Sequence, residues 1–418
     1  MVSAQAPDRA PDRAPDRMPD QPTPWPARLA GLAAAALALA CFMPLGSKYL
    51  AYLASGAFAL LALRRAGTLH ALRQAPGVPA TLALCALMAT SLLWTPAPLP
   101  FALAQLGVFA LVLLAAAIAR ACPPDFAQRV LCSFGVIAAA VGALSVIDHL
   151  ATLPASLWLT SSIQADGNQR IVTSLLLALG AAISGVQALA ATTRRPRLLW
   201  AAAVLLALLG LASQDRRTGM VAVPVLLAVL LLARQRSLWR SVAALLGVVV
   251  LTAAAWQASP SVRARFDEGL REVQAYQSID ATKTSWGMRL RLTEHTLAMV
   301  REAPWLGHGM GSWRTVFVQR VKPGLLISTN TTPHNEYLLM TAQLGLAGLA
   351  LWLWLLAAHL RHAWRSGPAG FAALLAWTAV AWAGLFNVVL RDAKFALPLL
   401  LLAGFAGALA RPAPAPAQ

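Results

Sequence analysis

The residues best suited to chemistry gather in one polar interval, residues 259–333, which separates two strongly apolar segments. Guanidinium groups bind phosphate oxygens through two parallel hydrogen bonds and stay charged at any physiological pH. A neutral imidazole can take a proton from a hydroxyl group. We therefore expect any reaction on a molecule other than lipid to take place here. The candidate side chains, including the helix start that follows the interval, are Arg289, Arg291, His295, His308 and His334.

The composition excludes a soluble globular enzyme. The chain has 418 residues, of which 58% are apolar and only 12% are charged. Backbone polar groups in hydrocarbon must be satisfied within each segment, and the Leu-, Ala- and Val-rich runs are too long for barrel strands, so they are helices. The net charge of +18 does not indicate a nucleic-acid partner, because in a membrane protein the distribution of charge matters more than its sum. The sequence thus predicts an all-α polytopic membrane protein.

Twelve apolar segments follow one another along the chain, near residues 29–45, 49–63, 78–94, 99–119, 130–147, 171–192, 198–212, 220–233, 241–257, 336–358, 369–388 and 395–410. The Pro-rich opening of the chain forbids a helix and does not resemble a signal peptide. The predicted organisation is a disordered cytoplasmic tail at 1–28, transmembrane helices one to nine at 29–257, a periplasmic loop with amphipathic helices at 258–335, transmembrane helices ten to twelve at 336–410, and a cytoplasmic tail at 411–418.

The arginines and lysines set the orientation. When the termini and every second loop are assigned to one side, that side carries eighteen of these residues. The opposite side carries six when the long loop, which is exempt from the rule by its length, is left out. Cytoplasmic loops are enriched in positive charge. Both termini are therefore predicted to be cytoplasmic, and the long loop is predicted to face the opposite compartment. In a diderm bacterium, that compartment is the periplasm and the multi-pass helices lie in the inner membrane.

Arg216 and Arg217 are exceptions, because they lie in a tight turn at the outer membrane boundary, where positive charge is disfavoured. An anionic ligand would explain them. The alternative is that Asp215 pairs with one arginine while the other reaches lipid phosphates. For a second outer cluster, formed by Arg391, Asp392 and Lys394, we favour a structural ion pair.

The long loop predicts two or three helices. Ser259 and Pro260 form a typical N-cap and first helical position, and apolar residues then recur at helical spacing. A second helix is expected from Met288 to Glu302 and is stopped by Pro304. The segment PWLGHGMGSW follows, and its glycines permit a tight turn or a close backbone approach to a ligand.

His334 is predicted to stand in the first turn of the tenth transmembrane helix, with Thr332 as N-cap and Pro333 at the first helical position. The helix dipole then favours the neutral imidazole that a general base requires. The alternative is a structural, hydrogen-bonded histidine. The other histidines receive structural or solvated roles: His295 and His308 in the loop, and His70, His359 and His362 on the cytoplasmic side.

Charged residues and histidines are missing from the middle of every predicted transmembrane segment. Ion-coupled transporters usually need such groups as relays and counter-ions, so their absence argues against a transporter. Four cysteines show no CxxC or Cys/His spacing, so the sequence predicts neither a disulfide nor a structural metal. They are Cys41, Cys85, Cys122 and Cys132.

Residues 198–405 resemble the bacterial O-antigen ligase superfamily, which also includes O-antigen polymerases and protein O-oligosaccharyltransferases. The resemblance is carried by motifs that flank one long outer loop. They are Arg217-Thr218-Gly219, Arg289 fifteen positions ahead of Pro304-x-x-Gly307-x-Gly309, His334-Asn335-x-Tyr337-Leu338, and Gly345-Leu346-x-Gly348. The first half of the chain matches in hydropathy alone.

The resemblance implies a glycosyltransferase of lipopolysaccharide biosynthesis that moves O-antigen glycan from undecaprenyl diphosphate to a hydroxyl group of lipid A-core at the periplasmic face. It implies that Arg217 and Arg289 bind the donor diphosphate, with Arg216 as an alternative to Arg217, and that His334 is the base. Further candidate contacts are Arg291, Arg391 and Asn335. Membrane lipid is the other expected partner, and no nucleic acid is expected.

The residue types support the same chemistry without a cofactor. Transfer requires deprotonation of the acceptor hydroxyl and stabilisation of the departing diphosphate. The sequence has no Asp-x-Asp pair for a divalent metal and no Walker loop, so arginines would replace the metal and the lipid-linked donor would supply the energy. A single displacement with inversion is the simplest reaction. The alternatives are an O-antigen polymerase or a protein O-oligosaccharyltransferase of the same superfamily and, outside enzymes, a flippase or exporter of polyprenyl lipids.

Overall fold

The computed structural model describes residues 25–411 except 157, 159–161, 166, 215, 236, 275–283 and 322–325. Regular structure in this part of the chain is entirely helical, which confirms the predicted all-α class. Nine of its helices are long and apolar enough to cross a membrane. Three shorter apolar helices, at Ala27–Ala40, Val78–Leu93 and Ala393–Leu409, match the remaining predicted segments. The apolar runs of the sequence therefore all form helices.

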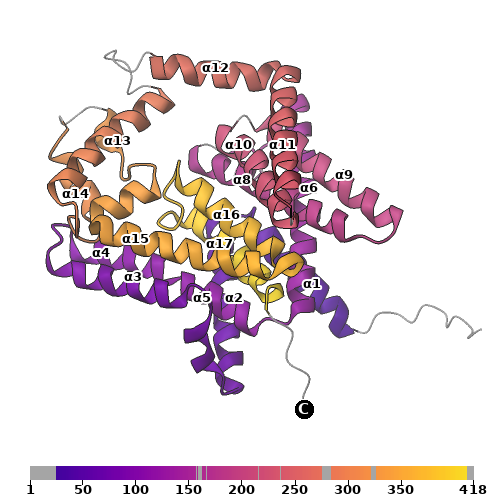
Figure 1. Cartoon of the computed structure of the whole chain (residues 1–418), viewed down its shortest axis with the longest axis horizontal. Coiled ribbons are helices and arrows are strands. Elements are labelled where there is room, and N and C mark those ends of the chain that lie inside the picture. Colours follow the sequence, from indigo (N-terminus) through magenta and orange to yellow (C-terminus); the bar gives the residue numbers. More distant parts are fainter. Residues whose placement is uncertain are drawn as a thin grey trace, which may run out of the picture.

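The helices are best located with Figure 1. The first half comprises α1 (Trp25–Ala40), α2 (Leu45–Arg65), α3 (Val78–Thr90), α4 (Leu99–Ala110), α5 (Val112–Ala121), α6 (Pro124–Ala151), α8 (Gly167–Ala190) and α9 (Arg194–Ser213). The second half comprises α10 (Arg217–Arg234), α11 (Leu238–Ala258), α12 (Pro260–Gln274), α13 (Ser285–Glu302), α14 (Ser312–Val318), α15 (Glu336–Arg365), α16 (Phe371–Gly384) and α17 (Ala393–Leu409). Short 3₁₀ turns lie at Leu69–Gln74, Ser91–Leu93, Leu326–Thr329 and Gly367–Gly370.

Helices α16 and α17 form the centre of the bundle and are buried along most of their lengths. Around them, α6, α8 and α9 pack closely through small residues. A Cβ atom on Gly142 of α6 would collide with the backbone of α9 at Leu206. Small residues let helix backbones approach within a membrane, where the contact rests on van der Waals packing. By contrast, α11 lies at the edge beside α10, and Val248 is the one buried side chain among its described residues.

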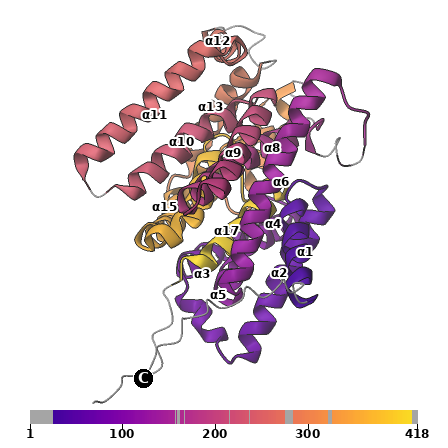
Figure 2. The same ribbon diagram turned by 90° about the vertical axis from the view of Figure 1, so that its right-hand side faces the viewer.

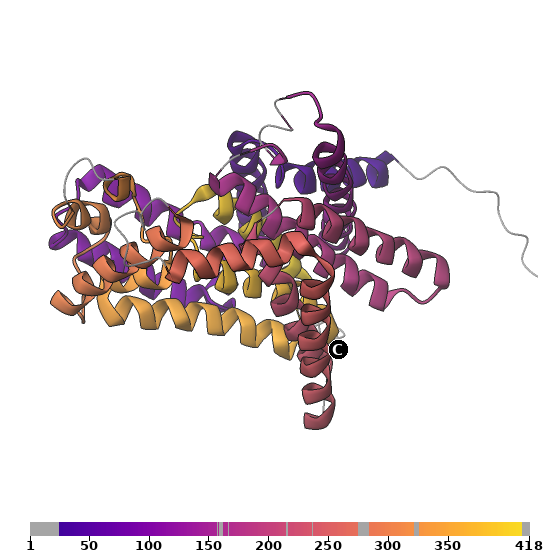
Figure 3. The same cartoon turned by 90° about the horizontal axis from the view of Figure 1, so that it is seen from above.

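The long loop forms the helices α12, α13 and α14 at one end of the bundle. As predicted, α12 begins at Pro260 and α13 ends at Glu302. The start of α13 lies three residues before the predicted one, because the side chain of Thr284 caps it by accepting a 3.1 Å hydrogen bond from the N–H of Gly287. Seen from above, α12 lies over the bundle (Figure 3).

The Gly-rich turn after α13 packs on a kink in α15. Gly345 interrupts that helix with a left-handed backbone (φ 65°), and a Cβ atom there would collide with the backbone of Trp305. The N–H groups of His308 and Gly309 donate hydrogen bonds to the carbonyl groups of Ala342 and Gln343, at 3.1 and 2.8 Å. The glycines therefore allow two backbones to touch, rather than a backbone and a ligand.

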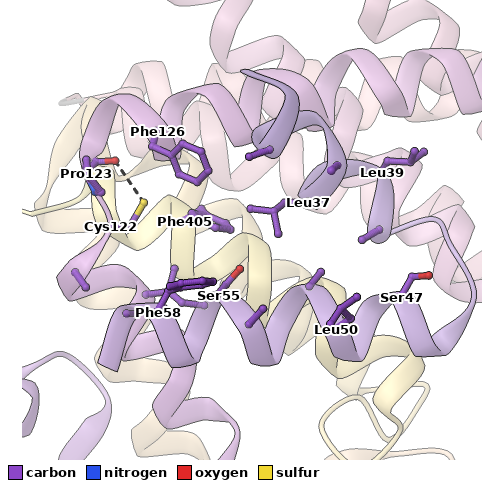
Figure 4. Close-up of a pocket in the computed structure, with 18 of the residues that line it drawn as sticks. Leu37, Leu39, Ser47, Leu50, Ser55, Phe58, Cys122, Pro123, Phe126 and Phe405 are labelled. Carbon is purple, nitrogen blue, oxygen red and sulfur yellow. Dashed lines mark hydrogen bonds between the residues drawn. The ribbon is translucent and has the colours of Figure 1, made fainter. Parts of the chain in front are cut away.

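An apolar cavity of about 790 Å³ lies between α1 and α2 (Figure 4). Most of its lining residues belong to the first third of the chain, far in sequence from the polar loop. Its floor includes Phe126 of α6 and Phe405 of α17, and small residues such as Ser47 and Ser55 line α2. A cavity of this composition inside a membrane suits lipid chains.

Candidate active site

A second cavity, of about 460 Å³, lies between α10, α11, α12, α13 and α16. It brings together residues that are far apart in the sequence. Its lining includes Arg217 and Thr218 of α10, Trp256 of α11, Phe266, Leu270 and Val273 of α12, Trp286 and Arg289 of α13, Trp382 of α16, and Phe386 directly after α16. Two of the arginines singled out by the sequence therefore line the same cavity.

Aromatic side chains form most of its wall. Trp256 stacks on Phe266 with ring centroids 5.7 Å apart, and Phe386 meets Trp382 edge-on at 5.0 Å. The indole N–H of Trp382 donates a 3.2 Å hydrogen bond to the carbonyl group of Thr218, which joins α16 to α10. The apolar stripe predicted for α12 thus faces this cavity. The site combines guanidinium groups with apolar walls, as an amphipathic anion requires.

Arg217 is the first residue of α10 and is held by two carboxylates of α12. Its Nη2 lies 3.0 Å from Oε2 of Glu268 and 3.4 Å from Oε1 of Glu272. The small residue that follows in the motif has a packing role, since a Cβ atom on Gly219 would lie 2.7 Å from the backbone of Ser174 in α8. The close contact between α10 and α8 therefore fixes the position of the Arg217 backbone.

Arg289 faces the cavity from the second turn of α13. Its Nη1 donates a 2.9 Å hydrogen bond to the hydroxyl group of Ser285, and its buried Nε has no hydrogen-bond partner among the described residues. Burial lowers the pKa of this guanidinium, the cation of Arg217 lowers it further, and Glu272 acts in the opposite direction. A partly buried cation with an unused donor is a suitable position for an anion to bind.

His334 lies in the loop before α15, so its predicted place in the first helical turn is wrong. The N-cap of α15 is Asn335, whose side chain accepts a 2.9 Å hydrogen bond from the N–H of Leu338 and donates one to the carbonyl group of Leu385 at 3.0 Å. His334 itself adopts a left-handed backbone (φ 53°), which is uncommon for a residue other than glycine and is frequent at functional sites. Thr332 does not cap the helix.

The imidazole of His334 is neutral for a different reason from the predicted helix dipole. Burial lowers its pKa to about 4, the positive charge of Arg289 contributes to the same shift, and Asp392 opposes it. Among the described residues His334 does not line the cavity of about 460 Å³. It lies beside that cavity, within reach of the electrostatic field of Arg289.

Three further candidates lie outside the cavity in the described structure. Arg216 occupies the N-cap position of α10 and is not part of the lining. Arg291 pairs with Glu294 of its own helix at 3.1 Å. Arg391 donates a 2.7 Å hydrogen bond to the carbonyl group of Thr331 and lies over a phenylalanine ring, while burial lowers its pKa.

The predicted ion pairs have a mixed outcome. Asp392 caps α17 by accepting from the N–H of Lys394 at 3.0 Å and accepts a 2.9 Å hydrogen bond from Asn168, so its carboxylate has partners other than Arg391. The charge of Asp392 still raises the pKa of Arg391. Asp215, proposed as a partner of Arg216 or Arg217, lies outside the described residues.

The remaining histidines are structural where the structure describes their contacts. His308 lies 3.0 Å from the carbonyl group of Met299, and His295 packs edge-on against Phe317, as predicted. The predicted solvated role of His359 is wrong. Its ring stacks on Trp377 with centroids 3.8 Å apart and packs against Gly77.

Sequence reasoning missed Glu268 and Glu272. Both are on the polar side of the helix whose apolar side was recognised, and their spacing of four residues places them on one face. The spacing of Glu268 and Glu272 could have shown that they share a face of the helix. It could not have shown that their partner is Arg217, which lies on another helix. The tryptophans of the cavity carried no local signal, because membrane-interface helices are rich in tryptophan.

The fold and this cavity define a polytopic membrane protein with an arginine-bearing site at one end of its helical bundle. A family model described as O-Antigen ligase matches residues 201–353. These residues, which make up less than half of the chain, are similar to the O-antigen ligase family. The match includes Arg217, Arg289 and His334 together with the helices from α10 to the first part of α15.

A relative among curated proteins is an uncharacterized protein of Haemophilus influenzae, which is 26% identical over 152 residues. The similarity covers 35% of this chain and 38% of that protein, so the chain spans less than half the length of the relative it matches. The similarity to the family therefore supports an enzyme of the ligase or polymerase type, and the long apolar helices support a membrane protein.

Proposed function

We propose that this protein is an O-antigen ligase that transfers glycan from undecaprenyl diphosphate to a hydroxyl group of lipid A-core at the periplasmic face of the bacterial inner membrane. The observation that carries the proposal is the shared cavity of Arg217 and Arg289, whose other walls are mostly aromatic and aliphatic and include the carboxylate residue Asp267. A polyprenyl diphosphate has the matching chemistry, with a charged head beside an apolar chain. The orientation rests on the distribution of arginines and lysines described above.

In the proposed reaction the acceptor oxygen attacks the anomeric carbon of the first glycan residue, and the bond from that carbon to the diphosphate breaks. The proton of the acceptor hydroxyl passes to the imidazole of His334. The electron pair of the broken bond stays on the diphosphate, where Arg217 and Arg289 stabilise the additional negative charge. A single displacement inverts the anomeric configuration.

The low pKa of His334 fits a base that becomes effective only with donor in place. Burial and the charge of Arg289 lower the pKa of His334 to about 4, so the imidazole is neutral at pH 7 but a weak base. A bound diphosphate offsets the charge of Arg289 and brings negative charge nearby, which raises the pKa of the imidazole. Donor binding and base strength are therefore coupled through one arginine.

The acceptor separates this proposal from its alternatives in the superfamily. The full chain is reconstituted in liposomes with undecaprenyl-diphosphate-linked glycan, and lipid A-core, a second lipid-linked glycan and an acceptor protein are offered in separate reactions. We expect transfer to lipid A-core. Transfer to the lipid-linked glycan identifies a polymerase, transfer to protein identifies a protein O-oligosaccharyltransferase, and movement of the intact donor across the bilayer without transfer identifies a flippase.

A further inference from the structure

Two carboxylates lie on the guanidinium of Arg217, where the proposed donor would place its phosphate oxygens. The contacts from Nη2 are 3.0 Å to Glu268 and 3.4 Å to Glu272. Carboxylate and phosphate oxygens bind a guanidinium in the same geometry. Diphosphate can therefore form its full set of hydrogen bonds with Arg217 only when it takes over a position that a carboxylate holds in this structure.

The two glutamates are held to different degrees. The side chain of Glu268 is 44% exposed, whereas that of Glu272 is 11% exposed. Glu272 also accepts a 2.7 Å hydrogen bond through Oε2 from the backbone N–H of Trp286, in the first turn of α13. N–H groups in a first turn have no partner within their own helix, so a carboxylate there is well placed. Glu272 thus connects α10, α12 and α13.

This connection has a consequence for Arg289, which lies one turn beyond Trp286 on α13. The cations of Arg217 and Arg289 repel each other, and the charge of Arg217 lowers the pKa of Arg289 in addition to the effect of burial. Glu272 offsets this repulsion, since its charge raises the pKa of Arg289 while its oxygens contact Arg217. It therefore keeps both guanidinium groups facing one cavity.

We propose that Glu268 is the exchangeable stand-in for the donor's phosphate, displaced from Arg217 when diphosphate binds, and that Glu272 remains in place and positions Arg217 against Arg289. The inference rests on the proposed function, because it assigns the diphosphate to this cavity. It identifies Glu268 as a determinant of donor affinity and Glu272 as a positioning residue.

Removing the two charges then has opposite effects. Without the carboxylate of Glu268, diphosphate no longer competes for Nη2 of Arg217, so it binds more tightly. Ion pairs that are half exposed are weak, so Kd is expected to decrease by a factor of about two to five at low salt. Without the carboxylate of Glu272, the two arginines lose their shared partner and diphosphate binds more weakly, by roughly tenfold or more.

The test uses the full chain in detergent and titrates it calorimetrically with farnesyl diphosphate as a soluble probe. Glu268→Gln and Glu272→Gln are compared with Glu294→Gln, a control that removes the same charge from a pair on the outside of α13. We expect Glu268→Gln to lower Kd, Glu272→Gln to raise it, Glu272→Asp to recover part of the loss, and Glu294→Gln to match wild type. The gain in Glu268→Gln should shrink as salt increases, because the competing contact is half exposed.

The outcomes separate this inference from the proposed function. If wild type binds the probe and Arg217→Ala does not, the cavity is the diphosphate site; an unchanged or raised Kd for Glu268→Gln then overturns the exchange. Wild-type affinity in Glu272→Gln, or a loss that Glu272→Asp does not reduce in protein shown to be folded by its thermal unfolding, overturns the positioning role. Absence of probe binding by wild type overturns the proposed function and the inference with it.

Discussion

Burial lowers the pKa of His334, in the loop before α15, and the cation of Arg289, on α13, lowers it further. Two elements that are separate in the chain thus share one electrostatic environment at the end of the bundle. If Arg289 binds the donor diphosphate, the same event that occupies the arginine also strengthens the neighbouring base. The site can therefore hold its histidine in a weakly basic state until substrate arrives.

Arg289→Ala should reduce glycan transfer strongly. The guanidinium stabilises charge that develops on the leaving diphosphate, and loss of such a group typically costs about 2–4 kcal/mol of transition-state free energy. The measurement is kcat/KM in the reconstituted transfer assay. The control is Arg301→Ala, which removes an exposed arginine near the end of the same helix. Equal activity in the two variants would contradict a phosphate role for Arg289.

His334→Ala should abolish transfer while leaving donor binding largely intact, because the imidazole is proposed to take a proton and the arginines to hold the diphosphate. Donor binding is measured by titration with farnesyl diphosphate, and transfer is measured in parallel on the same preparation. A variant that still transfers glycan at the wild-type rate would rule out His334 as the base.

The pH dependence of transfer should report the coupling between donor and base. A base acts in its deprotonated form, so the rate rises with pH through the pKa of His334. For the free enzyme, kcat/KM should decrease as the pH falls through about 4, where His334 becomes protonated. Bound diphosphate stabilises the imidazolium and raises its pKa, so kcat should begin to decrease at a higher pH than kcat/KM does. The coupling would be contradicted if kcat and kcat/KM decreased at the same pH, or if kcat decreased at a lower pH than kcat/KM.

Gly345→Ala should destabilise the fold near the site. The left-handed backbone costs an alanine about 1–3 kcal/mol, and its Cβ atom would also collide with the backbone of Trp305. The measurement is thermal unfolding in detergent. Gly107→Ala is the matched control, since a Cβ atom on Gly107 of α4 meets nothing within 4 Å, and alanine favours a helix interior. Similar unfolding temperatures for both variants would contradict the close contact.

Chelation of divalent metal should leave transfer unchanged. The prediction follows from the two guanidinium groups of Arg217 and Arg289, which can neutralise the leaving diphosphate without a metal ion. The reconstituted assay is run in excess EDTA and again after magnesium is restored. Loss of activity with EDTA that magnesium reverses would show that a metal ion takes part.

Hydropathy predicted the helices because each apolar run has to satisfy its own backbone in the membrane, whatever its neighbours are. The amphipathic helices of the loop were readable for a similar reason, since Ser259, Pro260 and Pro304 act locally. Positions such as Arg217 and Arg289 were found from motif spacing and from the unusual placement of positive charge. Local rules were sufficient for these features.

Contacts between distant segments were not readable in this way. The segment Thr332-Pro333-His334-Asn335 offers two residues that can cap a helix, and the structure uses Asn335, whose amide also reaches Leu385 of the α16 end. The pairing of Arg217 with Glu268 depends on how α12 folds back over α10. Likewise, two glycine motifs were recognised separately, while their mutual contact is tertiary.

The sparse packing of α11 bears on how a lipid-linked donor would enter. This helix carries Trp256 at the edge of the cavity and buries Val248 alone among its described residues. A molecule anchored by a long isoprenoid chain has to arrive sideways from the bilayer. Since α11 packs on α10 and α12 and buries a single side chain among its described residues, moving it aside disrupts few contacts with the bundle core. The entrance to the cavity would then face the lipid bilayer, and the isoprenoid chain of the donor would not have to pass through water.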